Sequence, residues 1–171
     1  MEVSDRIVIF SRGRLEQIGA PREIYEQPVN EFVARFIGVM NVLETDVRGG
    51  IARANELEFP APGHPDGMRL RLGFRPYAVQ ISPDLAHFRF RAVLRRTYFL
   101  GIMLRLELEL PSGLTVRSRI TKEEYAQLQL ADGLEVSFQI RQYRVLAKDT
   151  GNLPPELQET YEPPAHIGEH I

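Results

Sequence analysis

A run of alternating residues, Ile102–Leu110, constrains the fold of this chain more than any other feature. Its even-numbered positions are all Ile or Leu, whereas charged residues and one Met stand between them. A period of two is typical of a β-strand with one buried face, because successive side chains of a strand point to opposite faces. Pro111–Gly113 is a turn signal, and a second alternating run follows at 114–120. The sequence therefore predicts an antiparallel hairpin.

The register of this hairpin can be predicted as well. A three-residue loop would place Leu110 opposite Leu114, and Glu107 would then lie opposite Arg117 on the solvent-facing side. Such a cross-strand charge pair contributes about 0.2–1 kcal/mol and helps to fix the register.

The first residues of the chain predict a smaller unit. Residues 6–10 and 14–18 flank a tight-turn signal, which indicates another hairpin. Pro21 suits the first position of a short helix over 22–27, because proline lacks the N–H that is left unused there.

A second short helix is expected directly afterwards. Asn30 is its predicted N-cap and Gly38 its end. Its expected apolar face consists of Phe32, Val33, Phe36 and Ile37. Near residues 38–41 the helical spacing gives way to a period of two, which we interpret as a boundary.

Several further strands and one helix are predicted beyond this boundary. The expected strands lie at 41–47, from 51 onward, at 68–74, at 88–94 and from 136 toward 145. Gly49–Gly50 is a hairpin signal, and the residues Pro60–Gly67 are expected to form a loop. Thr121 and Glu124 form a capping-box pattern, which predicts a helix of about two turns.

These elements indicate a mainly β fold with a few short helices. Short strands joined by polar turns favour a small Greek-key barrel of the oligonucleotide/oligosaccharide-binding (OB) type, preceded by the hairpin and the two short helices. A β-sandwich is the competing architecture, and the pattern does not separate the two.

The composition is that of a globular chain without a strong overall charge. Among 171 residues, 43% are apolar and the formal net charge is -2, so no overall field points to nucleic acid or to an anionic membrane. The sequence contains no cysteine, which suits a reducing compartment. Its longest apolar stretch is far below the roughly 20 residues of a membrane span, and its first residues do not resemble a signal peptide.

Motifs of known chemistry are missing from the sequence. It contains no G-x-x-x-x-G-K-[S/T] phosphate loop, no G-x-G-x-x-G and no G-x-S-x-G. We expect no catalytic, cofactor-binding or metal site in this chain. His166 and His170 have a spacing that could place two imidazoles on one helical face, but Gly168 and nearby prolines favour a solvated tail.

Arginines in the predicted strand 88–94 and just after it are the remaining candidates. Arg89, Arg91 and Arg95 share a face and could contact single-stranded nucleic acid, but a solvated face balanced by glutamates is the favoured interpretation. Arg95 and Arg96 are a speculative contact for a tetrahedral oxyanion, because guanidinium groups match the geometry of such anions.

The N-terminal residues also resemble a known family. The matching segments are Glu2–Phe10, Gly13–Gly19, Pro21, Ile24–Tyr25, Pro28, Asn30, Phe32–Ala34 and Phe36–Gly38. This ordered pattern resembles the end of the ATP-binding domain of ABC-importer ATPases, just after the switch histidine. Ser4 stands where a small residue, often alanine, is usual.

The rest of the chain is similar to the regulatory domain of the same family. Asn41–Val42, Gly49–Gly50, Arg75–Pro76, Gly101, Leu104–Glu107 and Gly133 resemble the sulfate/thiosulfate importer branch, with much shared by molybdate, sugar, polyamine and iron importers. The resemblance implies a domain of the transport-associated OB-like (TOBE) type. It assigns 1–38 to the end of the ATP-binding domain, 39–148 to the TOBE-type domain and 149–171 to a tail.

The resemblance implies a regulatory function without catalysis by this chain. The Walker A and Walker B motifs, the signature motif and the switch histidine are absent, so the chain is expected to be a fragment of a transport ATPase whose ATP and Mg sites lie elsewhere. Implied partners are a second copy, the rest of the subunit and the transmembrane permease subunits at the cytoplasmic face of the membrane. A small oxyanion effector is an open alternative, and nucleic acid is not expected.

The resemblance also implies that the N-terminal hairpin, residues 6–18, lacks the sheet that it joins in the family. We expect it to pack on the rest of the chain, to pair with another copy or to fray.

Overall fold

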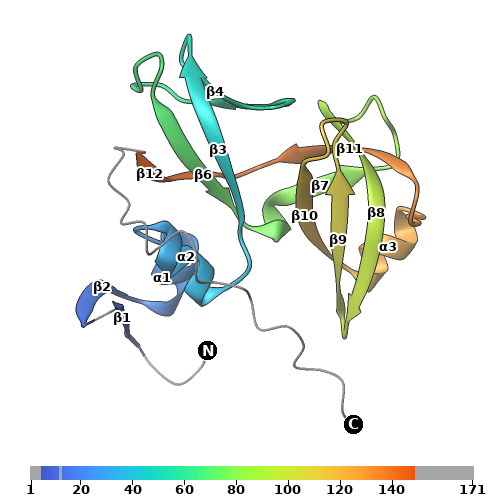
Figure 1. Cartoon of the computed structure of the whole chain (residues 1–171). Coiled ribbons are helices and arrows are strands. Elements are labelled where there is room, and N and C mark those ends of the chain that lie inside the picture. Colours follow the sequence, from blue (N-terminus) through green and yellow to red (C-terminus); the bar gives the residue numbers. More distant parts are fainter. Residues whose placement is uncertain (1–4, 12, 149–171) are drawn as a thin grey trace.

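A computed structural model describes residues 5–11 and 13–148 of the chain. The predicted tail, with His166 and His170, lies outside these residues. Two five-stranded sheets, one two-stranded hairpin and short helices make up the described part (Figure 1).

The N-terminal unit contains the predicted hairpin and both predicted helices. Strands β1 (Ile7–Ser11) and β2 (Arg14–Gly19) pair antiparallel, and helices α1 (Pro21–Glu26) and α2 (Glu31–Ile37) follow. This unit has a small apolar cluster of its own, formed by the buried residues Ile9, Ile24 and Val33. The hairpin therefore packs on the helices, the first of the three outcomes expected for it.

The second helix confirms the predicted cap but not the whole predicted face. The Asn30 side chain accepts a hydrogen bond from the Val33 backbone N–H at 2.9 Å, and Gly38 is the C-cap. Phe36 was placed on the buried face, and this was wrong: its side chain is 63% exposed and stacks on Phe32 at the surface. Ala34 is buried in its place, because the helix packs through the side that faces the β-sheet connection.

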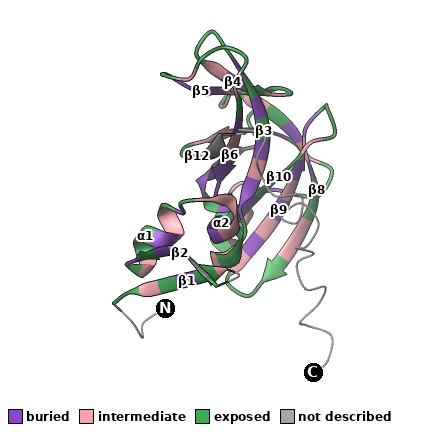
Figure 2. Ribbon diagram, turned by 60° about the vertical axis from the view of Figure 1, so that its left-hand side comes forward, coloured by how far each residue is buried: buried purple, intermediate pink, exposed green. Residues whose placement is uncertain are grey.

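The first large sheet has the strand order β12-β6-β3-β4-β5. Its strands are β3 (Asn41–Arg48), β4 (Ile51–Ala54), β5 (Leu57–Pro60), β6 (Arg69–Phe74) and β12 (Arg144–Lys148). Buried and exposed residues alternate along β3, as Figure 2 shows. Gly49 and Gly50 both have positive φ, which the tight β3–β4 turn requires.

The second large sheet has the order β10-β9-β8-β11-β7. Its strands are β7 (Val79–Ser82), β8 (Phe90–Leu100), β9 (Met103–Glu109), β10 (Thr115–Thr121) and β11 (Glu135–Ile140). A 3-10 turn, η1 (Pro76–Ala78), precedes β7, and helix α3 (Lys122–Gln127) follows β10 with the predicted capping box.

The β9–β10 hairpin has the predicted register. Glu107 lies opposite Arg117, and the Leu110 N–H donates to the Leu114 carbonyl at 2.9 Å. The prediction failed at one end, because Ile102 is 83% exposed. Ile102 follows Gly101 in the β8–β9 turn, where Gly101 has a φ of 69° and the strand has passed the edge of the core.

Two side chains link the open edge of β10 to other elements. The Ser118 hydroxyl donates to the Val79 carbonyl at 3.1 Å, which draws β10 toward β7. The buried Asn41 side chain both donates to the Arg117 carbonyl and accepts from the Arg117 N–H, each at 2.8 Å. Asn41 thus pairs with β10 as one residue of a neighbouring strand would.

The two large sheets share one apolar core. Buried side chains of the first sheet, such as Phe74, and of the second, such as Leu106 and Phe138, belong to the same cluster. The predicted mainly β, OB-like fold with a few short helices is confirmed, with its strands divided between two sheets.

Candidate functional site

A buried arginine joins the N-terminal unit to the sheets. Arg75 follows β6 and is only 4% exposed. Its Nη1 donates to the carbonyls of Ala34 at 3.0 Å, Gly38 at 2.9 Å and Val39 at 3.3 Å. Its Nη2 donates to the Tyr25 carbonyl at 2.9 Å, and its guanidinium carbon lies 4.2 Å from the centre of the Tyr25 ring.

The position of Arg75 explains how the cation is tolerated there. Burial lowers the pKa of its guanidinium, although an arginine stays charged at any physiological pH. Within the described part of the chain its hydrogen-bond acceptors are all backbone carbonyls, so the carbonyls of the α2 end and of the following residues solvate the charge. Cations are favoured at this end of a helix by its dipole. One side chain therefore ties α1, the end of α2 and the connection to β3 to strand β6.

An ion pair adds a second link between α2 and the same strand. Arg71 of β6 lies 2.9 Å from Glu31 of α2 and 3.2 Å from Glu44 of β3. The Arg71 and Glu31 side chains are 20% and 22% exposed, so this pair is only partly screened by solvent. We call Arg71, Arg75 and their partners the junction.

A cavity of about 510 Å³ opens beside the junction. It is lined by Glu26 of α1, by Arg75, Tyr77 and nearby residues of β6 and η1, and by 141–144, which connect β11 to β12. It thus lies where three parts of the chain meet: the N-terminal unit, the first sheet and the link between the sheets.

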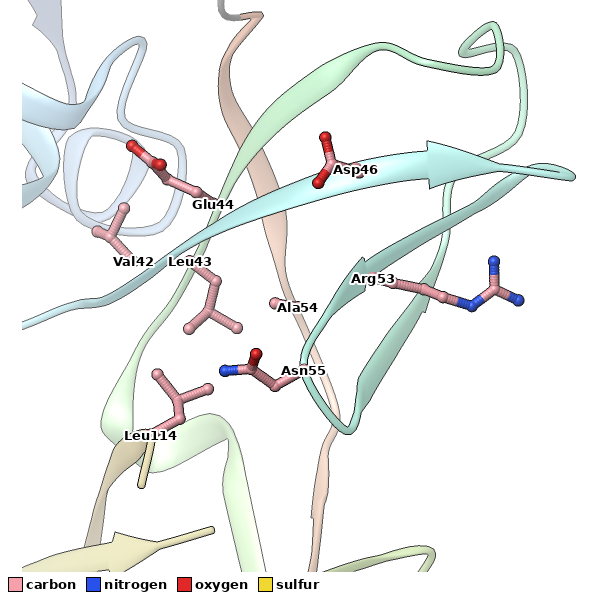
Figure 3. A pocket seen from close by; sticks show the side chains of 8 residues that line it. All are labelled: Val42, Leu43, Glu44, Asp46, Arg53, Ala54, Asn55 and Leu114. Atoms are coloured by element: carbon pink, nitrogen blue, oxygen red, sulfur yellow. The ribbon is translucent and has the colours of Figure 1, made fainter. Parts of the chain in front are cut away.

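A second hollow, of about 250 Å³, lies between β3, β4 and the start of β10. Figure 3 shows Leu43, Asn55 and Leu114 pointing toward one another there, whereas Glu44, Asp46 and Arg53 point away. The polar groups do not converge on this hollow, so it lacks the arrangement of a ligand site.

Arg95 and Arg96, the speculative oxyanion contacts, lie at a β-bulge of strand β8. Arg95 is the extra residue of β8, and Arg96 comes next, opposite Glu107. Arg95 is 2.9 Å from Glu109, and Arg96 donates to the Tyr98 hydroxyl at 3.3 Å, which raises the pKa of the Arg96 guanidinium. Both side chains are exposed and neither lines either hollow.

The arginine face formed by Arg89, Arg91 and Arg95 is largely balanced by acidic side chains. Arg89 pairs with Glu58, and Arg95 pairs with Glu109, whereas Arg91 is exposed. This agrees with the favoured interpretation of a solvated face. Within the described residues, no group of three potential ligands could hold a metal ion.

The sequence did not predict the junction, although it contains one signal of it. Arg75 precedes Pro76 at the end of a strand whose neighbours are all apolar or Gly, from Leu72 to Phe74. An arginine in such a run is buried only if it has several acceptors. Its partners lie 36 to 50 residues earlier, and no local pattern identifies them.

Comparison with known families identifies the class of protein to which part of this fold corresponds. Residues 86–147 match the TOBE domain. These residues comprise β8 to β11 and most of β12, so the match covers four of the five strands of the second sheet and the return to the first.

Curated relatives place the chain more closely. It is 36% identical to the sulfate/thiosulfate import ATP-binding protein CysA of Nitrosomonas europaea over 142 residues, which cover 80% of this chain and 39% of that protein. It is 33% identical to the molybdate/tungstate import ATP-binding protein WtpC of Pyrococcus abyssi, over 80% of this chain and 40% of that protein. The chain is therefore related to the ATP-binding subunits of ABC importers, as the resemblance predicted, and it spans about two fifths of their length.

One solved structure has a similar course of the backbone. The cytoplasmic molybdate-binding protein ModG, with molybdate bound, aligns with a TM-score of 0.49 over 61% of this chain and 95% of its own, at 16% identity. Of the helices described here, none is long and apolar enough to cross a membrane.

Proposed function

We propose that this chain is the regulatory and dimerising region of the ATP-binding subunit of an ABC importer. The observation that carries the proposal is the junction. Arg75 fixes the segment that resembles the end of an ATP-binding domain to the sheets of the TOBE-type region through four backbone carbonyls. A movement of either part is thereby transmitted to the other.

The function follows from this rigid connection. In such a subunit the hydrolysing domains act as a pair, and contacts between regulatory regions limit how far the pair opens. The effect is a bias on an equilibrium between two conformations, and its size is the difference between the contact free energies of the two states. No bond is made or broken by this chain.

The two parts of the proposed division each have an apolar cluster of their own. Residues 1–38 form the end of the ATP-binding domain, 39–148 the TOBE-type domain and 149–171 a tail. Within the described residues, the cluster around Ile9, Ile24 and Val33 draws only on the first of these parts, and the large core only on the second. A third cluster, formed by Ala34, Met40 and Leu146, crosses the boundary and packs the two parts together.

The partners follow from the same assignment. ATP and Mg bind to the part of the subunit that this chain does not represent. A second copy pairs with this region, and permease subunits hold the assembly at the cytoplasmic face of the membrane.

The first test measures hydrolysis and self-association of the 171-residue chain. We expect no turnover of ATP with Mg, and a concentration-dependent dimer in sedimentation velocity runs. ATP hydrolysis by the pure chain would refute the regulatory assignment. A chain that stays monomeric at several hundred micromolar would refute the pairing alone.

Sulfate or thiosulfate is the proposed solute, because the relative from Nitrosomonas europaea carries that name and matches slightly better than the molybdate/tungstate relative. Deleting the gene should abolish uptake of labelled sulfate and leave uptake of molybdate intact. The opposite pattern would assign the subunit to molybdate import.

A further inference from the structure

The cavity beside the junction has a lining of charged and aromatic side chains that the regulatory function does not itself require. Its volume of about 510 Å³ lies within the range of small-molecule sites in proteins. Its walls come from α1, from β6 and η1, and from the connection 141–143 with Arg144 at the start of β12.

The connection between the sheets is held in place at two points. The Arg141 N–H donates to the Ala78 carbonyl at 2.9 Å. The Tyr143 hydroxyl donates to the Pro60 carbonyl at 2.6 Å, and its ring packs edge-on against Phe59. The backbone that carries Arg141 and Arg144 is therefore fixed before any ligand arrives, which lowers the entropic cost of binding.

The lining carries an excess of positive charge. Arg141, Arg144 and Arg75 all line the cavity, and among the described residues that line it Glu26 is the only acid. Glu26 is itself paired with Arg22 at 2.9 Å. Within the described part of the chain, the side chains of Arg141 and Arg144 have no ion pair or hydrogen bond, whereas Arg75 uses its donors on carbonyls.

An aromatic wall completes the cavity. Tyr77 lines it, and its ring stacks on that of Tyr25 with a centroid separation of 6.2 Å. The Tyr77 phenol is protonated at neutral pH, because its ordinary pKa is 10.0 and burial raises the pKa further, so this hydroxyl can donate a hydrogen bond. Met40 and Phe74 add apolar surface to the lining.

We propose that this cavity binds an organic anion. A phosphate or carboxylate group lies between the guanidinium groups of Arg141 and Arg144, whose planar forks suit such oxygens. A flat apolar part lies against the ring of Tyr77. The site differs from the Arg95–Arg96 pair, where one arginine is already paired with Glu109 and neither arginine lines this cavity.

The location gives such an anion a regulatory effect. A ligand there contacts α1 and the connection between the sheets at once, so it stabilises one arrangement of the N-terminal unit on the TOBE-type region. This consequence rests on the proposed function. The binding itself does not, because it can be measured on the isolated chain.

The test titrates the 171-residue chain with phenyl phosphate, inorganic phosphate and, as a cationic control, phenyltrimethylammonium. We expect phenyl phosphate to bind more tightly than inorganic phosphate and the cation not to bind. Isothermal calorimetry gives the affinities, and amide chemical shifts of 77 and 141–144 report the location.

Exposed arginines provide matched variants. Arg141→Gln and Arg144→Gln should each weaken phenyl phosphate binding about tenfold, the loss expected for one charged hydrogen bond. Arg119→Gln removes an equally exposed arginine of β10 outside the cavity and should leave the affinity unchanged. All three variants should keep the thermal midpoint of the parent, because the side chains are exposed.

Three results would overturn the proposal. They are no binding of phenyl phosphate at millimolar concentration, equal weakening by Arg119→Gln, and shift changes confined to residues away from the cavity. Loss of dimerisation or of sulfate uptake would bear on the proposed function alone.

Discussion

The N-terminal unit and the two-sheet region are stabilised in different ways. The sheets share a continuous apolar core, in which residues such as Leu106 and Phe138 are fully buried. Among its described residues, the N-terminal unit has only three buried apolar residues in its own cluster. Its hairpin leaves Val8, Phe10, Leu15 and Ile18 substantially exposed.

The difference shows that polar contacts compensate for a small core. A unit of about 35 residues buries too little apolar surface to be stable alone. Arg75, Arg71 and Glu31 attach it to the region with the larger core, and Ala34 of α2 packs with Met40 and Leu146 at the same place. The order of the N-terminal unit therefore depends on a few named contacts. The two regions should therefore respond to different substitutions.

The largest effect is expected in the shared core. Phe138→Ala removes a fully buried ring whose centroid lies 5.6 Å from that of Phe90. This substitution should lower the free energy of unfolding by about 3–5 kcal/mol. Urea unfolding followed by circular dichroism measures this loss. Phe99→Ala is the control, because Phe99 is 66% exposed and should change stability by no more than about 0.5 kcal/mol.

A smaller and local effect is expected at the junction. Arg75→Met leaves the carbonyls of Tyr25, Ala34 and Gly38 without their donor, which we expect to cost about 3 kcal/mol. Hydrogen exchange should then show faster exchange in α2 and unchanged protection in β9. Arg75→Lys should recover only part of the protection, because one ammonium cannot reach all three carbonyls. Equal loosening of β9 would mean that the two regions unfold together.

The smallest effect on stability is expected at the exposed ion pairs of Glu58, and this effect depends on pH. Glu58 of β5 pairs with Arg53 and Arg89, and these hydrogen bonds lower the pKa of its carboxyl below the ordinary value of 4.5. A lowered pKa in the folded state means that the ionised carboxylate stabilises the fold above 4.5, and that this contribution is lost as the pH falls through the lower value.

Glu58→Gln should therefore reduce the urea midpoint slightly at pH 7, and the difference from the parent should shrink by pH 3. The Arg75→Met penalty should persist at pH 3, because the hydrogen-bond partners of Arg75 among the described residues are backbone carbonyls, which do not titrate. A penalty for Arg75→Met that disappears in acid would show that an acidic group supports the junction after all.

Local patterns predicted most of the fold. The alternation in Ile102–Leu110 correctly predicted a strand and the Glu107–Arg117 pairing. The Asn30 and Thr121 caps correctly predicted the starts of two helices. The predicted burial was wrong at the end of one strand, because Ile102 lies beyond the core. It was also wrong where tertiary packing decides which side of a helix is buried, because Phe36 lies on the outer side of its helix.

The candidate site was much less predictable than the fold. The junction depends on contacts between Arg75 and carbonyls of residues 25–39, and backbone carbonyls carry no sequence signature. The cavity likewise combines 26, 73–78 and 141–144, which periodicity places on separate elements. Arg95 and Arg96 were visible as a pair in the sequence, whereas the structure gives Arg95 a carboxylate partner and Arg96 a phenol partner.

The Asn41 amide affects whether a strand of another molecule can add to the edge of the second sheet at β10. A strand at the border of a sheet can accept a strand from another molecule, which leads to irreversible association. On β10 the outward N–H and carbonyl of Arg117 are already engaged by Asn41. An intruding strand would have to displace this amide from its buried position first, so the Arg117 position of this border is closed to the addition of a strand.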